Sequence, residues 1–411
     1  MKREANNEQG GPLSHIRVLD MSRILAGPWA AQILADLGAE VIKVERPGRG
    51  DDTRLWGPPY LKDRDGSDTT ESGYFLSANR GKYSITVDIT RPEGQSLIRE
   101  LVRKSDVLLE NYKVGGLAEY GLDYDSLNQV KPDLVYCSIT GFGQTGPLSN
   151  RPGYDIMIQA MSGLMSITGE TDGEPQKSGV AVSDLLTGMY AAVAVQAALI
   201  HRDRTGQGQH IDLALLDVQL ACLANQAVNY LISDTVPGRT GNAHPNIVPY
   251  QSFATVDGRI IIAAGNDRQF ARLCDLLECP GLSRDDRFVS NRSRVENRDA
   301  LIPVLQGQLK QRETAFWQER LEAAGIPCSP INTLDSAFAE EQVIHRGMKM
   351  ELPHPHAGMV SMVASPLKFS RSAVVHRRPP PLLGQHTDEV LSELLGMKKT
   401  EVDSLRKNKI V

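Results

Sequence analysis

The chain has 411 residues, of which 41% are hydrophobic and 23% are charged, and its formal net charge is −5. Its length indicates two or three domains of roughly 150 residues each. The composition is that of an ordinary globular protein and excludes disordered, collagen-like and mucin-like chains. Because a mildly acidic chain has no overall attraction to nucleic acid or to an anionic membrane, we expect neither as a partner.

The cysteines and the apolar stretches indicate the cellular compartment of the protein. Its five cysteines form no CxxC pair and are widely spaced, which is typical of reduced thiols in a reducing compartment. Residues 1–10 are polar, contain no secretory signal and are expected to form a flexible tail. The most apolar stretch, 185–199, is shorter than the roughly 20 residues of a membrane span. We therefore expect a cytoplasmic protein without a membrane anchor.

Strands and helices alternate through the first part of the chain. The expected strands are 16–20, 40–45, 83–89, 106–112 and 133–140, and the expected helices are 28–37 and 92–104. A strand, a helix and a strand within about thirty residues indicate a βαβ unit with parallel strands. We therefore expect an open α/β sheet with helices on both faces.

The later part of the chain predicts a second, smaller domain. The expected elements are a helix at 185–202, a strand at 210–215, a hairpin at 252–264 turning at Asp257–Gly258, and helices at 267–278 and 298–324. The turn-rich segment 233–246 is expected to be a linker. We expect the small domain at 247–330 and a large domain built from 11–232 and 331–411.

One glycine-rich motif suggests nucleotide binding, but its surroundings do not support that function. GFGQTG (141–146) matches GxGxxG and follows a strand, yet it continues into Pro147 rather than into a helix that would hold a pyrophosphate. The sequence also contains no P-loop, HExxH or GxSxG motif, and His354 and His356 lie in a Pro-rich loop. We expect no metal site and no permanently bound cofactor.

Asp184 stands where the sequence changes from extended to helical. An extended run ends at Ser183–Asp184 and an apolar helix begins, so Asp184 is expected at the helix N-cap. The helix dipole and the unpaired N–H groups there favour the ionised form, which keeps the carboxylate available as a nucleophile. On this pattern alone, a catalytic carboxylate and an ordinary helix cap both remain open.

Basic residues gather at the end of the expected strand 40–45. Lys43, Arg46, Arg49 and Arg54 lie in VIKVERPGRGDDTR. Arginines that follow a strand in an α/β fold can bind phosphate through paired N–H groups. A solvated, charged loop explains the same residues, so the pattern leaves both interpretations open.

Several segments together resemble the class III CoA-transferase family (CaiB/BaiF type). They include VLDMSRILAGP (18–28), LGAEVIKVERPGRGDDTR (37–54), YCSITGFGQTGP (136–147), GVAVSDLLTGMYAA (179–192) and PPPLLGQHTDEVL (379–391). The matching segments run in family order along nearly the whole chain. The resemblance is closest to the branch that acts on succinyl-CoA and short dicarboxylic acids such as glutarate, hydroxymethylglutarate or itaconate.

The resemblance implies a fold, an assembly and a set of site residues. The family fold is a large doubly wound, Rossmann-like α/β domain plus a small α+β domain, and two chains form an interlocked ring dimer. The family's nucleophilic aspartate falls on Asp184, Arg46 would face a phosphate, and Tyr154 would border the thioester. The family's CoA contacts fall on Leu25, Ala26, Arg46, Val87, Asp88, Asn111, Tyr112, Lys113 and Tyr154.

The implied reaction is the transfer of CoA from an acyl-CoA to a carboxylate. Asp184 would attack the thioester, pass through a mixed anhydride and an aspartyl-CoA thioester, and hand CoA to the acceptor. Backbone N–H groups near Asp184 and in the turn 141–146 are candidates for stabilising the oxyanions. The acyl-CoA is then a substrate and not a resident cofactor. Candidate cations for a second carboxylate are Arg54, Arg80, Arg239 and His244, and the sequence does not choose among them.

Departures from related patterns narrow the reaction. The region 233–255 has no run of glycines like that of formyl-CoA:oxalate transferases, so oxalate and formate are not expected as substrates. An α-methylacyl-CoA racemase or epimerase on the same fold is the alternative function. Those enzymes use the histidine of a GHD motif as a base, whereas this chain has Gly153–Tyr154–Asp155, and a tyrosine with a pKa near 10 is a poor base at neutral pH.

Overall fold

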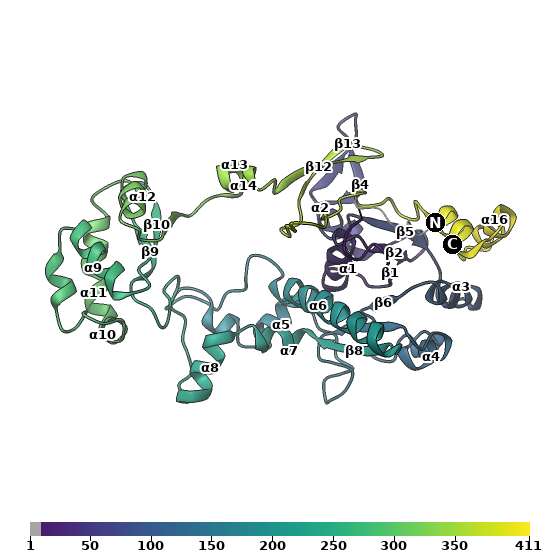
Figure 1. Cartoon of the computed structure of the whole chain (residues 1–411), viewed down its shortest axis with the longest axis horizontal. Helices are drawn as coiled ribbons and strands as arrows, with labels where there is room; N and C mark the ends of the chain where they lie inside the picture. The colour runs from purple at the N-terminus through teal and green to yellow at the C-terminus, as the bar shows by residue number, and fades with distance from the viewer. Residues whose placement is uncertain (1–9) are drawn as a thin grey trace. The chain divides into compact units, whose positions relative to one another are not determined.

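The computed structural model describes residues 10–411, so the tail expected at 1–10 lies outside the described residues except for its last position. The chain divides into two compact units, and Figure 1 labels most of their helices and strands. Unit 1 contains the chain up to Ser162 together with Ser178–Ala227 and Gln342–Val411. Unit 2 contains Gly163–Lys177 and Val228–Glu341.

Unit 1 is built on a six-stranded sheet in which each neighbouring pair of strands is parallel. Its order is β5-β2-β1-β6-β7-β8. The strands are β1 (Arg17–Asp20), β2 (Glu40–Glu45), β5 (Lys82–Thr86), β6 (Val107–Glu110), β7 (Val135–Thr140) and β8 (Gln209–Ala214). The chain runs outward in one direction from β1 and in the other from β6. This reversal leaves a crevice beyond the carboxyl ends of β1 and β6, where open α/β sheets bind ligands.

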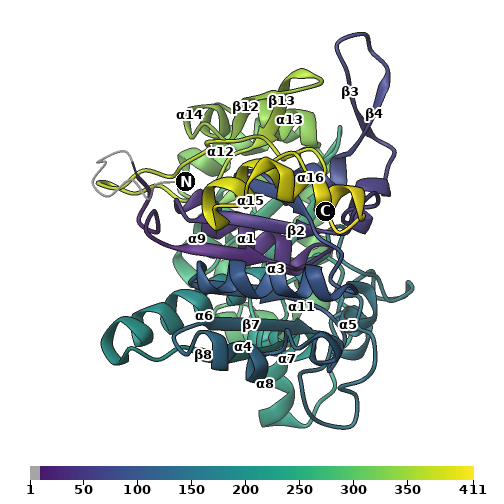
Figure 2. The same ribbon diagram turned by 90° about the vertical axis from the view of Figure 1, so that its right-hand side faces the viewer.

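Helices cover both faces of this sheet, as expected for a doubly wound α/β fold. They are α1 (Ala26–Asp36), α3 (Pro92–Arg103), α4 (Tyr124–Val130), α5 (Asp155–Met161), α6 (Val182–Thr205), α7 (Leu215–Ala221), α15 (Thr387–Leu395) and α16 (Lys399–Lys407). Figure 2 shows α3, α15 and α16 in front of the sheet. The C-terminal segment therefore returns to unit 1, where α15 packs on β5 and α3.

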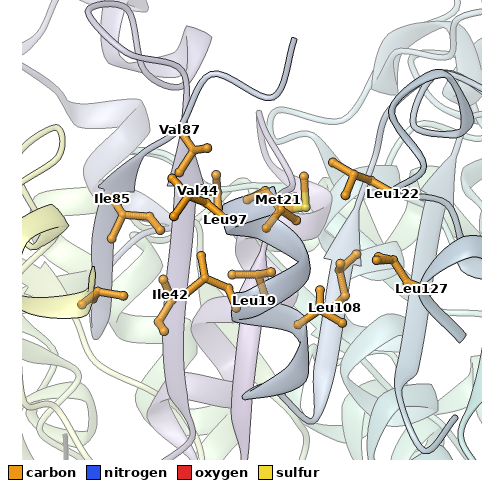
Figure 3. Packing of buried hydrophobic residues seen from close by; sticks show 14 of the residues in the cluster. Leu19, Met21, Ile42, Val44, Ile85, Val87, Leu97, Leu108, Leu122 and Leu127 are labelled. Atoms are coloured by element: carbon orange, nitrogen blue, oxygen red, sulfur yellow. The ribbon is translucent and has the colours of Figure 1, made fainter. Parts of the chain in front are cut away.

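Alternating side chains of the strands divide the core of unit 1 into two clusters. Leu19 and Ile42 pack with α3 and α15 in one cluster, part of which Figure 3 shows. Val18 and Val41, one residue earlier in each strand, pack with α1 and α6 in the other. The period of two along a strand is what sends neighbours to opposite faces. Each face of the sheet therefore carries its own hydrophobic core, as is usual where helices cover both faces.

The remaining elements of unit 1 are short. They are α2 (Gly73–Ser77), the antiparallel pair β3 (Tyr60–Lys62) and β4 (Asp68–Ser72), the antiparallel pair β12 (Lys349–His354) and β13 (Gly358–Val363), and 3₁₀ turns at Asp52–Leu55 and Ala118–Tyr120. Helices α8 (Ala224–Ser233) and α14 (Glu341–His345) span the divisions between the units.

Unit 2 combines a small antiparallel sheet with helices. The sheet has the order β11-β10-β9, and the hairpin expected at 252–264 is present, with Arg259 paired to Ala254. Its strands and helices are β9 (Tyr250–Ala254), β10 (Arg259–Ala263), α9 (Asp267–Leu276), α10 (Asn291–Glu296), α11 (Arg298–Leu309), α12 (Thr314–Ala323), β11 (Cys328–Pro330) and α13 (Leu334–Ala339). Phe253, Phe270 and Trp317 lie in its apolar core.

The stretch 298–324, expected as one helix, is two. The carboxylate of Asp257 in the hairpin turn accepts the backbone N–H of Thr314 at 2.8 Å and so satisfies an open donor at the start of α12. The indole N–H of Trp317, in α12, donates to the carbonyl of Leu309, the last residue of α11. Both contacts join residues that are not neighbours in a helical pattern, so periodicity alone does not reveal the break.

Unit 2 also extends beyond the segment 247–330 that was expected as the small domain. It includes the expected linker 233–246, and that linker binds the distant segment 163–177. The guanidinium of Arg239 donates to the carbonyl of Glu170 at 3.1 Å, and the N–H of Gly241 donates to Gly169 at 3.1 Å. Contacts between segments about 70 residues apart decide this boundary, and composition does not report them.

Helix α6 is the one described helix that is long and apolar enough to cross a membrane, and 44% of its most apolar window is buried in the structure. It packs closely against α1 in unit 1, where a Cβ on Gly188 would come within 2.6 Å of the carbonyl of Ala26. A buried core helix has the same apolar composition. The other side of α6 leaves Met189, Val193 and Ile200 exposed.

Candidate active site

The loop after β1 is held in place by a residue of the expected site. The side-chain amide of Asn111, just past β6, accepts the N–H of Arg23 at 2.8 Å and donates to the carbonyl of Arg23 at 2.6 Å. Ile24 has φ +70°, which is an unfavourable conformation for a β-branched residue. The carboxylate of Asp51 accepts its N–H at 3.2 Å and helps to hold this strained turn.

Buried ion pairs support this loop from below. The ammonium group of Lys43 contacts Asp51 at 2.9 Å and donates to the carbonyl of Ser22 at 2.9 Å. Lys82 contacts Asp20 at 2.9 Å, and none of these four charged side chains is exposed. Burial raises the pKa of Asp20, but the positive charges of Lys82 and Lys43 outweigh it and lower that pKa below its ordinary value. Charged partners thus fix the base of the loop without presenting their charge to the site.

A cavity of about 400 Å³, which we call the Asp184 cavity, lies beyond these strand ends. It brings together the majority of the site residues that the sequence predicted, namely Leu25, Ala26, Asn111, Tyr112, Lys113, Tyr154 and Asp184. Leu25 and Ala26 have buried side chains, so they can offer a ligand little besides backbone. Tyr154 is 58% exposed and is therefore accessible to a ligand.

The other predicted residues line an adjoining cavity of about 390 Å³, which we call the Arg46 cavity. Arg46, Val87 and Asp88 belong to it and not to the Asp184 cavity. Val87 is buried in the core, and the carboxylate of Asp88 accepts the N–H of Thr90 at 3.0 Å, so this segment presents a turn. The two cavities share Arg23, Tyr112 and Lys113 in their linings.

Asp184 is not the N-cap that the sequence predicted. Helix α6 begins at Val182, its N-cap is Ala181, and Asp184 lies in the first turn. The carboxylate of Asp155 accepts the N–H of Ser183 at 2.8 Å and lies 3.4 Å from the N–H of Asp184. Asp155 therefore performs the capping role from the neighbouring helix α5, and the side chain of Asp184 lines the cavity instead.

The protonation of Asp184 also differs from the expectation that it stays readily ionised. Burial, and then the negative charge of Asp155, raise the pKa of Asp184 from 3.8 to about 7. The same charges act on Tyr74, whose pKa is raised to about 12 by burial and by Asp184. A carboxyl group with this pKa is partly ionised at neutral pH, and its carboxylate is more basic than an exposed one.

The glycine-rich turn 141–146 is not followed by a helix until α5 begins at Asp155, which confirms that it lacks the context of a dinucleotide site. Gly141 packs on Gly153, where a Cβ would come within 2.6 Å of the other glycine's Cα. The N–H of Gly143 donates to Thr140 at 2.9 Å, and that of Gln144 donates to Asp212 at 3.0 Å. These two donors are already used, so they are not the oxyanion donors that we expected of this turn.

Two of the four candidate cations for a second carboxylate are engaged in buried ion pairs. Arg54 contacts both Glu45 and Glu71 at 2.8 Å, and Arg80 binds Asp36 through its Nε at 2.9 Å. Arg239 and His244 belong to unit 2, where Arg239 binds backbone carbonyls. The sequence patterns did not single these pairs out because each joins residues from different elements.

The Asp184 cavity contains two arginines that the sequence analysis did not single out. Arg23 pairs with Asp52 at 3.1 Å and lies over the ring of Tyr112 at 5.4 Å. Arg151 is exposed, and its guanidinium lies 6.0 Å from the ring centre of Phe142. Arg151 follows the glycine-rich turn in PLSNRPGYD, three residues before Tyr154. Its closeness in sequence to Tyr154 is the feature from which it could have been predicted as a site residue. Within residues 10–411, no group of three or more His, Cys, Asp or Glu side chains is arranged to hold a metal ion.

These features define an α/β protein with a buried carboxyl group in a cavity at the switch point of a parallel sheet. The chain belongs to CoA-transferase family III, whose model matches residues 13–387. Members of this family use CoA thioesters as substrates, so the protein is a transferase of this class.

Individual proteins are similar along almost their whole length. The succinate–glutarate CoA-transferase of Agrobacterium fabrum is 50% identical over 394 residues, covering 95% of this chain and 97% of that protein. The human succinyl-CoA:glutarate CoA-transferase is 48% identical, covering 93% of this chain and 86% of that protein. The crystal structure of a CaiB/BaiF family protein from Brucella suis superimposes with a TM-score of 0.83 at 49% identity, covering 94% of this chain and all of that one.

Proposed function

We propose that the protein transfers CoA from succinyl-CoA to a short dicarboxylic acid, with glutarate as the first candidate. The observation that carries this proposal is the buried carboxyl group of Asp184 in a cavity that shares a wall with the Arg46 cavity. The names of the similar proteins from Agrobacterium fabrum and Homo sapiens support the pair of acids. In this arrangement the reacting acid lies beside Asp184 and the phosphates of CoA lie beside Arg46.

The electrostatics of Asp184 suit a covalent nucleophile. Attack of its carboxylate on the thioester carbonyl breaks the C–S bond, releases CoA thiolate and forms a neutral mixed anhydride. Acylation therefore removes a negative charge that is buried and repelled by Asp155. The thiolate then attacks the aspartyl carbonyl and releases succinate. The acceptor carboxylate attacks the resulting aspartyl-CoA thioester, and the freed thiolate takes the acyl group of the second anhydride and regenerates Asp184.

The residues around the Arg46 cavity suit the nucleotide end of CoA. Arg46 and Arg49 are exposed there, and guanidinium groups bind phosphate with paired hydrogen bonds. The turn at Val87–Asp88 and the ring of Tyr112 complete the wall. We propose that the acyl-CoA extends from this cavity past Tyr112 and Lys113 to Asp184, since those two residues line both cavities.

We further propose a homodimer of interlocked chains that works in the cytoplasm. Apolar side chains on α6 and α8 support the dimer, because a lone chain leaves Val193, Ile200, Leu231 and Ile232 each more than 60% exposed. All five cysteines are free thiols in the structure, in keeping with a reducing compartment. Sedimentation of the purified protein distinguishes a dimer from a monomer.

One experiment tests the reaction directly. The protein is incubated with succinyl-CoA, treated with hydroxylamine and analysed by peptide mass, and the expected result is a modification on Asp184 that Asp184→Asn lacks. Formation of glutaryl-CoA is then followed with glutarate as acceptor. An unmodified Asp184 with no CoA exchange would overturn the proposal. Exchange of the α-proton of a 2-methylacyl-CoA in place of transfer would support the racemase alternative.

A further inference from the structure

Glu110 lies directly behind the wall that the two cavities share. It is the last residue of β6, and its carboxylate accepts the backbone N–H of Tyr112, two residues later, at 2.7 Å. Its register partner on β7 is Ser138, whose hydroxyl favours the ionised form of the Glu110 carboxyl group. Ser138 Oγ in turn shares a hydrogen bond of 2.9 Å with Nε2 of His210 on β8. Glu110, Ser138 and His210 therefore form a row across three neighbouring strands, with Ser138 in the middle.

His210, the last residue of this row, is also held in place. The ring of His210 stacks on Tyr124 with centroids 5.0 Å apart and planes at 17°, and its edge meets Tyr136. Glu110, Ser138 and His210 line a separate cavity of about 200 Å³, and Lys113 belongs to the lining of this cavity as well. The row of three side chains therefore extends from His210, which is packed between aromatic rings, to Glu110, which binds the backbone of Tyr112.

A contribution to the stability of the fold does not explain why a glutamate is buried at position 110. Its side chain is only 5% exposed, and in the described part of the chain the groups that act on it are Ser138 and the N–H of Tyr112, with no lysine or arginine paired to it. Burial raises its pKa to about 7. The other buried carboxylates of this region, such as Asp20 and Glu45, have cationic partners. A buried carboxyl group without a cation costs stability, so its contribution lies in the backbone it holds.

The backbone that Glu110 holds belongs to the segment 111–113, whose three residues are all candidate site residues. Asn111 binds the loop at Arg23, whereas Glu110 binds the N–H of Tyr112, so the segment 111–113 is held at two successive residues. Without the bond to Glu110, Tyr112 and Lys113 are held through Asn111 and the contact of the Tyr112 ring with Arg23. A shift of this segment changes the shape of the Asp184 cavity and the Arg46 cavity together.

We propose that Glu110 is a positioning residue that holds Tyr112 and Lys113 where they bind CoA, and that Ser138 and His210 hold Glu110 in turn. This inference rests on the proposed function, because it assumes that the shared wall contacts CoA. It predicts an effect on the affinity for the CoA group and little effect on the acylation of Asp184. The conservative variant Glu110→Gln keeps an oxygen for the N–H of Tyr112 and an amide for Ser138, so it retains the function.

The test compares Glu110→Ala, Glu110→Gln and Ser138→Ala in the full-length protein. Glu100→Ala, an exposed carboxylate on α3, is the matched control for the loss of a glutamate. Titration calorimetry with CoA measures binding without turnover, and steady-state kinetics with succinyl-CoA give KM and kcat separately. Thermal unfolding of each variant shows which of them are folded.

We expect Glu110→Ala to weaken CoA binding and raise the KM for succinyl-CoA by about tenfold, with kcat within about twofold of wild type. Ser138→Ala should weaken binding by about threefold, while Glu110→Gln and Glu100→Ala should stay within about twofold of wild type. If Glu110→Ala does not fold, the contrast between Ser138→Ala and Glu110→Gln decides the question.

Three results would overturn this inference. The first is unchanged CoA affinity in a folded Glu110→Ala variant. The second is unchanged CoA affinity in Ser138→Ala when Glu110→Ala does not fold. The third is a loss of kcat in Glu110→Ala at constant CoA affinity. Each leaves the proposed function intact if the wild type binds CoA and is acylated at Asp184. A wild-type protein that does not bind CoA would overturn both.

Discussion

The carboxylate of Asp155 occupies the N-terminus of the helix that carries Asp184, with its oxygen 2.8 Å from the N–H of Ser183 and 3.4 Å from that of Asp184. The positive end of the helix dipole is thereby satisfied by a neighbour. Burial and the negative charge of Asp155 both disfavour the ionised form of Asp184, and within residues 10–411 no cation is paired with it. Burial raises the pKa of Asp184 most, and the carboxylate of Asp155 that caps the helix raises it further.

Replacing Asp184 should abolish transfer without harming the fold. Asp184→Asn removes the carboxylate that accepts the acyl group, and we expect at least about a thousandfold lower kcat. Because the change also removes a buried, repelled charge, Tm should be unchanged or higher. Kinetics and thermal unfolding on the same preparation measure both. Transfer activity close to that of wild type would show that another residue is acylated.

The rate should depend on pH through the ionisation of Asp184. Since its pKa is about 7, kcat/KM should rise with pH and level off above that value, and at two units below it should be lower by about a hundredfold. Asp155→Asn keeps an oxygen for the N–H of Ser183 but removes the negative charge, so its profile should shift to lower pH. A profile in Asp155→Asn identical to wild type would mean that Asp155 adds nothing to the effect of burial on this pKa.

Stability should also change with pH because of Asp184 and Glu110. Burial raises both pKa values to about 7, so the folded chain holds these protons more tightly than the unfolded chain. The stability that they contribute is complete below about pH 4 and is lost as pH rises through about 7. The double variant Asp184→Asn/Glu110→Gln should therefore lose less Tm than wild type between about pH 5 and pH 8. Equal slopes in both proteins would contradict this assignment.

Arg151 should contribute to the choice of acid. It lines the Asp184 cavity and is exposed, so its guanidinium is accessible to the second carboxylate of glutarate. We expect Arg151→Gln to raise the KM for glutarate by about tenfold and to reduce the preference for glutarate over butyrate. Arg204→Gln, at the exposed end of α6, is the control. An unchanged ratio between the two acids would assign the second carboxylate to another cation.

The buried pair of Lys82 and Asp20 should be costly to break. Burial lowers the pKa of Lys82 to about 8, even though Asp20 at 2.9 Å favours its charged form. Lys82→Met leaves Asp20 buried beside Lys43 alone, and we expect a loss of about 3–5 kcal/mol in the free energy of unfolding. Adding Asp20→Asn should restore part of it, because the uncompensated charge is removed. Denaturant titration of the single and double variants measures the coupling.

The sequence predicted the parallel sheet well because its signals are local. β2 occupies 40–45 as expected, and α1 ends where Gly38 follows with φ +99°. The candidate site residues came from the family resemblance, and the linings of the two cavities contain all of them. The buried pair of Arg54 and Glu71, the capping of α6 by Asp155 and the attachment of 163–177 to unit 2 depend on contacts between distant segments. Periodicity and turn composition carry no information about such contacts.

The wall formed by Tyr112 and Lys113 has a kinetic consequence. In the proposed mechanism, succinate leaves and the acceptor acid enters beside Asp184 while CoA is covalently attached to it. The nucleotide end of CoA would then stay bound while the acids exchange at the other end. Because the Asp184 cavity and the Arg46 cavity are separate but share a wall, the acid can exchange in the first while the nucleotide end of CoA stays bound in the second. A carboxylate inhibitor should therefore compete with the acceptor acid and trap CoA on the protein, whereas an adenosine phosphate should compete with the acyl-CoA.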